Sequence, residues 1–353
     1  MKKLFLLLII ALPLACNVGQ KQNTGATRIF TDMAGRRIEI PAQVKSVFAG
    51  RHPIHALYAF DTANVVNRVF NYTETEKRYL KKSFYEGKPY ALENADEEIM
   101  HLKPDIVLYA ETITPSVVEE MNALQERLQV PVVLLDNNFL NYKSTLTCLG
   151  DLLGKPEKAA ELVDFVERYV DPILEKSKTI PEEAKKRIYY AEGMNGLKTD
   201  PSGSLHSLLI DVVGGCNVAK TEVLPGKGMT NVSAEQIYTW QPEIILVWSG
   251  NFDGMDSYRE IHSSPVWGNL EAVKSGKVYQ VPWRPFGWID RPPGLNRLIG
   301  IIWLSYILYP EVYQIGDLKP IVQEFFLKFY HYEMSDEEAA ELINPHPPLS
   351  FLQ

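Results

Sequence analysis

The sequence is poor in cysteine and lacks the usual metal-ligating motifs. Of its 353 residues, three are cysteines, at positions 16, 148 and 216, and neither a CxxC motif nor a His/Cys zinc spacing occurs. The seven histidines are scattered along the chain, so we do not expect a structural zinc site. We expect Cys148 and Cys216, which fall in different halves, to be buried and free rather than joined in a disulfide.

Basic clusters and catalytic signatures are also missing from the body of the chain. Lys and Arg number 36 against 44 Asp and Glu, for a net charge of -8, so nucleic acid is not an expected partner. Neither a nucleophile elbow, a phosphate-binding loop nor a dinucleotide fingerprint occurs, which argues against an enzyme. The length favours two α/β lobes, and the 46% of hydrophobic residues is typical of a globular protein.

A short targeting segment is present at the N-terminus. Lys2 and Lys3 precede an apolar stretch at 4–12 that is too short to span a bilayer, which favours a secretion signal. Residues 12–16 (LPLAC) are similar to a lipobox, although Pro13 stands where Leu is commonest. We predict a lipoprotein signal peptide at 1–16 ending at an acylated Cys16, then a flexible tether at 17–27. Plain secretion with an incidental cysteine is the alternative.

Short β-branched runs alternate with helical patterns in both halves of the chain. In the first half the runs lie at 44–49, 65–70, 105–110 and 131–135, with an amphipathic segment at 116–128. In the second they lie at 187–191, 243–248 and 277–281, with helical patterns at 204–213 and 295–308. Such runs are typical of parallel sheets covered on both faces. We predict an α/β fold with two Rossmann-like lobes, at 28–150 and 183–353.

The two predicted lobes are connected by a helical pattern rather than by a loop. Apolar residues keep a helical spacing over 156–178, which is about six turns. A single long α-helix is stiffer than a loop, so we expect the lobes to move little relative to one another.

Several segments resemble one family when taken in order. They are 30–36 (FTDMAGR), 94–99 (NADEEI), 102–107 (LKPDIV), 149–154 (LGDLLG), 214–219 (GGCNVA), 232–236 (VSAEQ) and 272–279 (AVKSGKVY). Together they resemble the periplasmic binding proteins for iron-siderophore, haem and cobalamin, the class III proteins with a helix between two lobes. The segments at 303–310 and 325–330 are similar to a metal-chelate subgroup.

The resemblance implies the substrate-binding component of an ABC importer. Such a protein is a monomer without a cofactor, which works with a permease and its ATPase in the periplasm or cell envelope. Its ligand is a metal chelate, with a ferric siderophore first and cobalamin, haem or a nickel complex as alternatives. A surface lipoprotein scaffold, or an enzyme on the same fold, is the alternative from another class.

The candidate ligand-binding residues follow from the position of loops relative to strands. In doubly wound sheets, ligands lie beyond the carboxyl ends of the strands, and two facing lobes place these loops on opposite walls of one cleft. The candidates are Arg51, His52, Asn71, Tyr72, Glu111, Thr112, Asn137 and Asn138 in the first lobe. In the second lobe they are Glu192, Met194, Trp248, Ser249, Trp283, Arg284, Trp288, Arg291 and the loop 226–230.

The chemistry of these candidates fits an anionic chelate. A loop tryptophan packs either in the core or against a ligand, and arginine forks pair with carboxylate or catecholate oxygens. His52 and Met194 offer a pair of haem-iron ligands, although a hydrogen-bonded loop histidine is the plainer interpretation. We expect no other direct metal ligand.

Two glutamates are candidates for docking to the permease. The resemblance implies one docking glutamate per lobe, and Glu97 and Glu235 stand at the matching positions. Both also lie in predicted capping boxes, Asn94 with Glu97 and Ser233 with Gln236, which explains an acidic helix start without any partner. The two roles are compatible.

Overall fold

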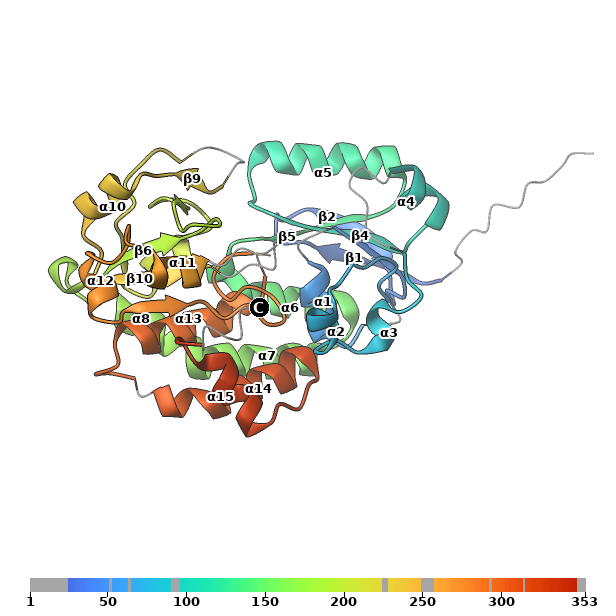
Figure 1. Ribbon diagram of the computed structural model, residues 1–353. Coiled ribbons are helices and arrows are strands. Elements are labelled where there is room, and N and C mark those ends of the chain that lie inside the picture. Colours follow the sequence, from blue (N-terminus) through green and yellow to red (C-terminus); the bar gives the residue numbers. More distant parts are fainter. Residues whose placement is uncertain are drawn as a thin grey trace, which may run out of the picture.

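Two lobes lie side by side in the computed structural model of this chain (Figure 1). The structure describes residues 25–50, 53–62, 65–89, 96–223, 228–248, 257–291, 294–313 and 315–347. The predicted signal peptide with Cys16, and all but the last three residues of the predicted tether, lie outside this part of the chain.

The first lobe combines a hairpin with a parallel sheet. The hairpin pairs β1 (Thr27–Thr31) with β2 (Arg37–Pro41), and the sheet has the order β3 (Val47–Ala49), β4 (Ile106–Glu111), β5 (Val132–Asp136). The helices are α1 (Ile54–Ala59), α2 (Glu74–Lys77), α3 (Lys82–Tyr85), α4 (Asp96–Leu102), α5 (Pro115–Leu128) and α6 (Tyr142–Leu153), which follows the 3-10 turn η1 (Phe139–Asn141). The predicted strand at 65–70 is reduced to a parallel bridge between Val66 and Val47.

Local sequence explains where the longest helix of this lobe begins and ends. Thr114 accepts a hydrogen bond from the backbone N–H of Val117, and Pro115 stands in the first turn, where its missing N–H costs nothing. The helix ends at Gln129, whose φ of 54° is left-handed.

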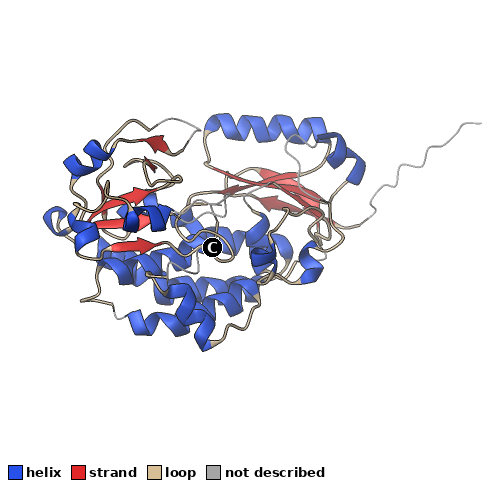
Figure 2. Ribbon diagram, in the orientation of Figure 1, coloured by secondary structure: helices blue, strands red, loops and turns tan. Residues whose placement is uncertain are grey.

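The second lobe is built on a four-stranded parallel sheet, visible at the left of Figure 2. Its order is β11 (Val278–Gln280), β10 (Ile244–Val247), β6 (Arg187–Ala191), β8 (Cys216–Asn217), and β7 (Lys198–Thr199) pairs separately with β9 (Thr230–Asn231). The helices are α9 (Leu208–Val212), α10 (Ala234–Trp240), α11 (Ser257–Ser263), α12 (Glu271–Lys274), α13 (Asn296–Leu308), α14 (Leu318–Tyr330) and α15 (Asp336–Ile343), with short turns η3 (Glu182–Ala184) and η4 (Ile315–Asp317).

Both sheets have the same strand order. In each lobe the first strand along the chain lies between the second and the third, with the fourth beyond the third. The order therefore reverses between β3 and β4 in the first lobe and between β6 and β10 in the second. A doubly wound sheet binds its ligand at such a switch point, beyond the carboxyl ends of the two strands.

The predicted connecting helix is present, although it is not uniform. It runs through α7 (Pro156–Phe165), the π-helical segment η2 (Val166–Val170) and α8 (Asp171–Ser177). Pro172 lacks the N–H that would bond one turn back, which accounts for the local departure from α-helical geometry just before it.

The C-terminal helices cross back to the first lobe. α14 packs on α1 and α7 as well as on α13, and the Tyr58 hydroxyl of α1 donates to the Tyr330 carbonyl of α14 at 3.1 Å. One hydrophobic core runs through both lobes, from Phe30 to Trp303, while separate clusters cover the other face of each sheet. The connection between the lobes is thus a packed layer of helices, visible along the bottom of Figure 1.

Cys148 and Cys216 are free, as predicted, although both are half-buried rather than buried. Burial raises the pKa of the Cys148 thiol to about 12. Among the described residues, helices long and apolar enough to cross a bilayer are absent.

Candidate functional site

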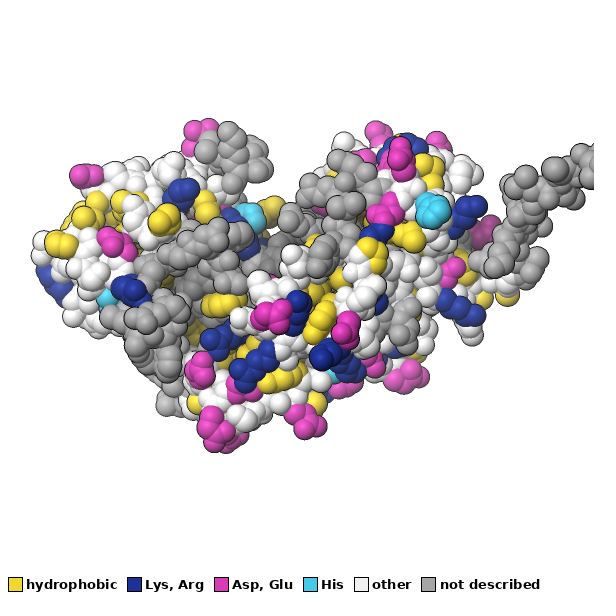
Figure 3. Space-filling model, turned by 45° about the vertical axis from the view of Figure 1, so that its right-hand side comes forward, with side chains coloured by type: hydrophobic (Ala, Val, Ile, Leu, Met, Phe, Trp, Pro, Cys, Tyr) yellow, Lys and Arg dark blue, Asp and Glu magenta, His cyan; other side chains and the backbone are white. Residues whose placement is uncertain are grey.

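The strand-end loops of the two lobes meet at one buried arginine. Arg297, at the start of α13, is 6% exposed and donates to the carbonyls of Ile289 and Leu205, both at 3.2 Å. Its guanidinium also lies 5.3 Å from the ring centroid of Phe139, which follows β5 of the first lobe. The carboxyl ends of both sheets therefore face the same interior, and the molecular surface is hollowed between the lobes (Figure 3).

Aromatic side chains form the joint beneath this hollow. The rings of His55 in α1 and Phe286 in the loop after β11 stack with centroids 3.9 Å apart. Tyr330 donates to the side-chain oxygen of Asn296, and Asn296 donates to the Phe286 carbonyl at 2.9 Å. We call Tyr58, Phe139, Phe286, Arg297 and Tyr330 the interlobe joint.

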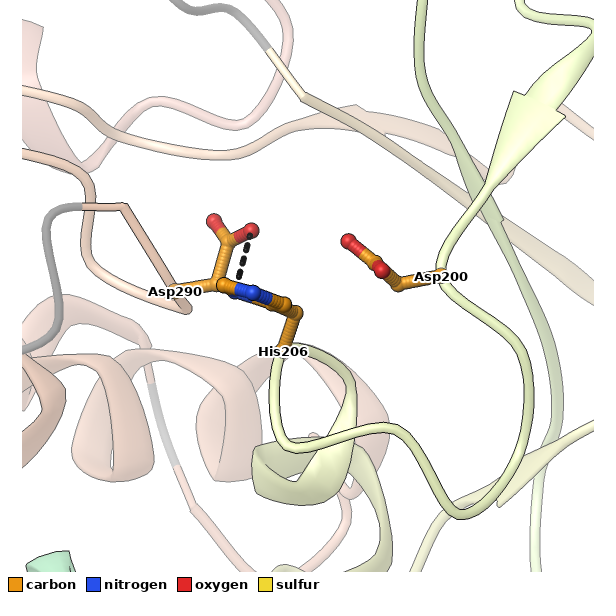
Figure 4. Close-up of side chains that lie close together, drawn as sticks. All are labelled: Asp200, His206 and Asp290. Atoms are coloured by element: carbon orange, nitrogen blue, oxygen red, sulfur yellow. Dashed lines mark ion pairs between the residues drawn. The ribbon is translucent and has the colours of Figure 1, made fainter. Parts of the chain in front are cut away.

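The second lobe contributes a cluster of buried charges at its switch point. Glu192 directly follows β6, Asp200 follows β7, and Asp290 and Arg291 lie in the loop after β11. The Arg291 guanidinium binds all three carboxylates: Glu192 at 2.7 Å, Asp200 at 2.6 Å, and its neighbour Asp290. His206 joins them, with Nδ1 3.8 Å from a carboxylate oxygen of Asp290 (Figure 4). We call these five residues the acidic cluster.

Surrounding polar groups hold the carboxylates in place. The Tyr190 hydroxyl donates to Asp290 at 3.1 Å, while the Ser204 hydroxyl and the Met229 N–H donate to Asp200 at 3.3 and 3.2 Å. The chain at Gly228 has a φ of +53°, and a Cβ there would lie 2.7 Å from Arg291 Nη2. Glycine is required at this position because the backbone approaches the guanidinium so closely.

Burial and mutual charge set the protonation states in the acidic cluster. Burial, and then the charge of Asp290, raises the pKa of Glu192 well above its usual value, which favours its protonated form. Burial also raises the pKa of Asp290 and lowers that of His206. For Asp200, burial is outweighed by Arg291, and its pKa is lowered. With Glu192 protonated and His206 neutral, Asp200 and Asp290 are the carboxylates that face Arg291, and the charge of Arg297 also acts on Asp290.

Three of the predicted ligand-binding residues gather at this cluster. Glu192 is fully buried, Arg291 keeps 22% of its side chain exposed, and Trp248 lies beneath Arg291 with its ring 5.8 Å from the guanidinium carbon. Met194, in the adjacent loop, is 68% exposed. Arg291 thus meets protein carboxylates here, whereas the sequence suggested a free cation for an anionic ligand.

Other predicted residues lie elsewhere. Trp288 is fully buried and donates its indole N–H to the Arg284 carbonyl at 3.0 Å, so the structure assigns it to the core. Arg284 binds Glu341 of α15 at 2.9 Å, while Trp283 is half-buried. Tyr72 is 4% exposed among the rings of the joint, including Phe286 at 6.0 Å.

The first-lobe candidates are less completely described. Glu111 ends β4, and its carbonyl accepts a hydrogen bond from the backbone N–H of Asn137 at 3.0 Å; both residues are half-buried. Asn138 caps the turn at η1 by accepting from Leu140. Arg51, His52, Ser249 and the first two residues of the loop 226–230 lie outside the described residues.

The sequence interpretation missed Asp200, His206, Asp290 and Arg297. Asp200 follows a two-residue strand, too short to give a pattern, and His206 was one of seven scattered histidines. Asp290 stood inside a loop that was already singled out, directly before Arg291. The one signal in the sequence was the carboxylate of Asp290 directly beside Arg291, which suggests that the arginine is bound by a protein carboxylate.

The predicted docking glutamates are both exposed, one on each lobe. Glu97 lies in the first turn of α4 and Glu235 in the first turn of α10. The predicted capping box of Ser233 with Gln236 is confirmed, whereas Asn94 lies outside the described residues. α4 and α10 lie in the upper part of their lobes, at opposite sides of the molecule (Figure 1).

The comparisons with known proteins agree with this architecture. A family model described as periplasmic binding protein matches residues 55–285, and the chain belongs to this family. It is the substrate-binding protein of an ABC importer, a non-enzymatic component that works with a permease and an ATPase.

Relatives and solved structures extend the match over most of the chain. The molybdate-binding protein MolA of Haemophilus influenzae is 25% identical over 348 residues, covering 89% of this chain and 94% of the relative. The haem uptake protein IsdE of Staphylococcus aureus is 26% identical, covering 62% and 73%. The ABC transporter solute binding protein of Sulfurospirillum deleyianum superposes with a TM-score of 0.79 at 28% identity, covering 89% and 98%.

Proposed function

We propose that this protein captures a metal chelate between its lobes, with a ferric siderophore as the first candidate, and delivers it to the permease. The observation that carries the proposal is the meeting of both strand-end edges at Arg297, which turns two switch points toward one hollow. Capture in such a hollow leaves the ligand chemically unchanged. Cobalamin, haem and a nickel complex are the alternatives within the same role.

The charge of the hollow favours a metal-bearing ligand over a bare oxyanion. Molybdate is the ligand named for the Haemophilus influenzae relative. In this chain, the Arg291 guanidinium is already bound by Glu192, Asp200 and Asp290. An anion entering this wall would have to compete with three carboxylates for the Arg291 guanidinium.

Ligand panels test the proposal directly. Purified protein is titrated with ferric hydroxamate and catecholate siderophores, cyanocobalamin, haemin, a nickel–histidine complex and molybdate, with tryptophan fluorescence as the readout. We expect stoichiometric quenching by a metal chelate. Trp248→Phe should reduce the amplitude because this ring lies at the acidic cluster, and Trp240→Phe on α10 is the matched control. Tight binding of molybdate alone contradicts the proposal.

The docking role of Glu97 and Glu235 is part of the same proposal. Their exposure at two ends of the molecule supports a contact with one permease subunit each. The pair of exchanges Glu97→Ala and Glu235→Ala should abolish uptake in cells while leaving ligand affinity unchanged. Glu119→Ala on α5 and Glu271→Ala on α12, both exposed, are the controls. A fall in affinity would mean that the two glutamates support the fold instead.

We also propose that Cys16 carries a lipid anchor and that the protein acts as a monomer. Mass spectrometry of the membrane fraction, with Cys16→Ser as the comparison, tests the anchor through the mass of the attached lipid.

A further inference from the structure

We infer that the acidic cluster is a divalent transition-metal site, with Asp200, His206 and Asp290 as ligands and Arg291 as a competing cation. The inference rests on the proposed function, because a metal-bearing cargo would bring its ion to this wall of the hollow. Here the ion itself is held by protein ligands, at three residues that carried no predicted role.

The geometry suits a small cation. One ligand atom from each of Asp200, His206 and Asp290 lies within 4.8 Å of the others. Bonds of about 2.0–2.2 Å hold the ligands of such an ion at most about 4.4 Å apart, so the side chains need to close by only a few tenths of an ångström. The three side chains come from separate segments and point toward one another (Figure 4).

The donor set indicates which cations fit. One imidazole and two carboxylates suit first-row divalent ions such as nickel, zinc and manganese better than copper(I), which prefers sulfur. The side chain of His206 is 35% exposed, which leaves solvent access to the ligand set. Open coordination positions on that side would accept ligands from a chelate.

Two buried atoms of the acidic cluster, one in Glu192 and one in His206, lack a hydrogen-bond partner among the described residues. Glu192 is 0% exposed, and its second carboxylate oxygen has no hydrogen-bond partner among the described residues, although the first binds Arg291 at 2.7 Å. The Nδ1 atom of His206 is likewise without a hydrogen bond. A protonated Glu192 can donate to Asp200, whereas the His206 Nδ1 atom, 3.8 Å from the nearest Asp290 oxygen, has no such partner. Buried polar atoms are almost always satisfied, so His206 Nδ1 points to a group that arrives with the ligand.

Arg291 occupies the place of the ion. Its guanidinium bridges carboxylates from three segments, as a metal would, and it is the cation on which all of them converge. A divalent ion and Arg291 therefore compete for Asp200 and Asp290. Loss of Arg291 should therefore strengthen metal binding. Loss of an arginine that binds an anionic ligand would instead weaken the binding of that ligand.

The test uses isothermal titration of the purified, chelator-stripped full chain with nickel, zinc and manganese chlorides. We expect one equivalent of at least one ion to bind. His206→Gln should weaken binding by at least about 10- to 100-fold, because changing a group that only orients a metal ligand already has an effect of that size. Arg291→Gln should strengthen it at least about tenfold, since a like charge is removed from the site. His101→Gln, exposed on α4, should have no effect.

A second variant keeps the test decisive if Arg291→Gln does not fold. Arg291→Lys retains a positive charge but cannot bridge three carboxylates, so it should also strengthen binding. Cobalt(II) supplies a spectroscopic check: its visible absorption should appear in the wild type and be lost in His206→Gln. His262→Gln tests the other histidine pair, since His262 lies near His346.

Three results would overturn the inference. The first is that none of the three ions binds either the wild type or Arg291→Lys. The second is that the Arg291 variants bind metal more weakly than the wild type. The third is that metal binding is lost in His262→Gln but kept in His206→Gln. The proposed function is judged separately by the chelate titration. If a chelate quenches tryptophan fluorescence but the free ion does not bind, only the metal site is contradicted. If the free ion binds but no chelate changes the fluorescence, only the proposed cargo is contradicted.

Discussion

Two arginines six positions apart in the sequence, Arg291 and Arg297, lie in very different surroundings. Arg297 belongs to the interlobe joint, where it donates to the neutral carbonyls of Ile289 and Leu205 and covers the ring of Phe139. Arg291 belongs to the acidic cluster, where it binds three carboxylates. Both are largely buried, yet only one is surrounded by opposite charge.

The difference separates a structural arginine from a functional one. Neutral acceptors of the second lobe satisfy Arg297 without bringing further charge into the core, and its contact with the Phe139 ring connects the lobes. Three carboxylates around Arg291 are more than one cation requires, and burying extra charge is costly unless something compensates it. Such an excess is expected where a ligand completes the site, and not where the chain only needs to fold.

Trp288→Ala should give the largest effect, and it should be confined to stability. The side chain is fully buried against α13, where the Gly300 Cα approaches so closely that a Cβ would lie 1.8 Å from the Trp288 carbonyl. Truncating a buried tryptophan lowers the free energy of unfolding by about 3–5 kcal/mol. Urea unfolding measures the loss, with half-buried Trp240→Ala as the milder control. A loss of ligand affinity with unchanged stability would mean that Trp288 contacts the ligand rather than the core.

Arg297→Met should give the next largest effect. The buried carbonyl of Ile289 and the part-buried carbonyl of Leu205 lose their charged donor. Each such bond contributes about 1.5 kcal/mol or more, so we expect unfolding to be easier by about 3 kcal/mol. Added divalent metal should not alter this difference, because the joint has no carboxylate of its own. If metal restores the stability of Arg297→Met, the joint and the acidic cluster act as one unit and the comparison fails.

Sequence patterns predicted the parts of the molecule that repeat a local rule. Parallel strands, α5, α13 and the connecting helix each show periodic apolar residues, and loops after strands located Glu192, Trp248 and Arg291. The partners of Arg291 could not be predicted, because Glu192 and Asp200 lie 99 and 91 residues away in the sequence. Whether a loop tryptophan is buried is likewise decided by packing, and Trp248 and Trp288, both candidates from the sequence, are both buried in the same core.

His331→Asn should give the smallest effect, visible only as a change in pH dependence at the edge of the joint. His331 ends α14 with a φ of 52°, and its Nε2 lies 3.1 Å from the Tyr58 carbonyl. Burial lowers its pKa; the Tyr58 carbonyl and Asp61 oppose this, and Lys81 and Lys158 add to it. Asparagine also tolerates left-handed backbone, so the fold should be kept.

The sign of the effect follows from the lowered pKa. Above the unfolded-state value of about 6.5 the histidine is neutral in both states and contributes no pH dependence. As the pH falls below it, the unfolded chain takes up the proton first, so stability falls until the lower folded-state pKa is passed. His331→Asn should therefore lose less stability than the wild type between pH 7.5 and 5.5 in urea unfolding, and His101→Asn should behave as the wild type. Equal losses in all three proteins would place His331 outside the packed joint, with its ring open to solvent.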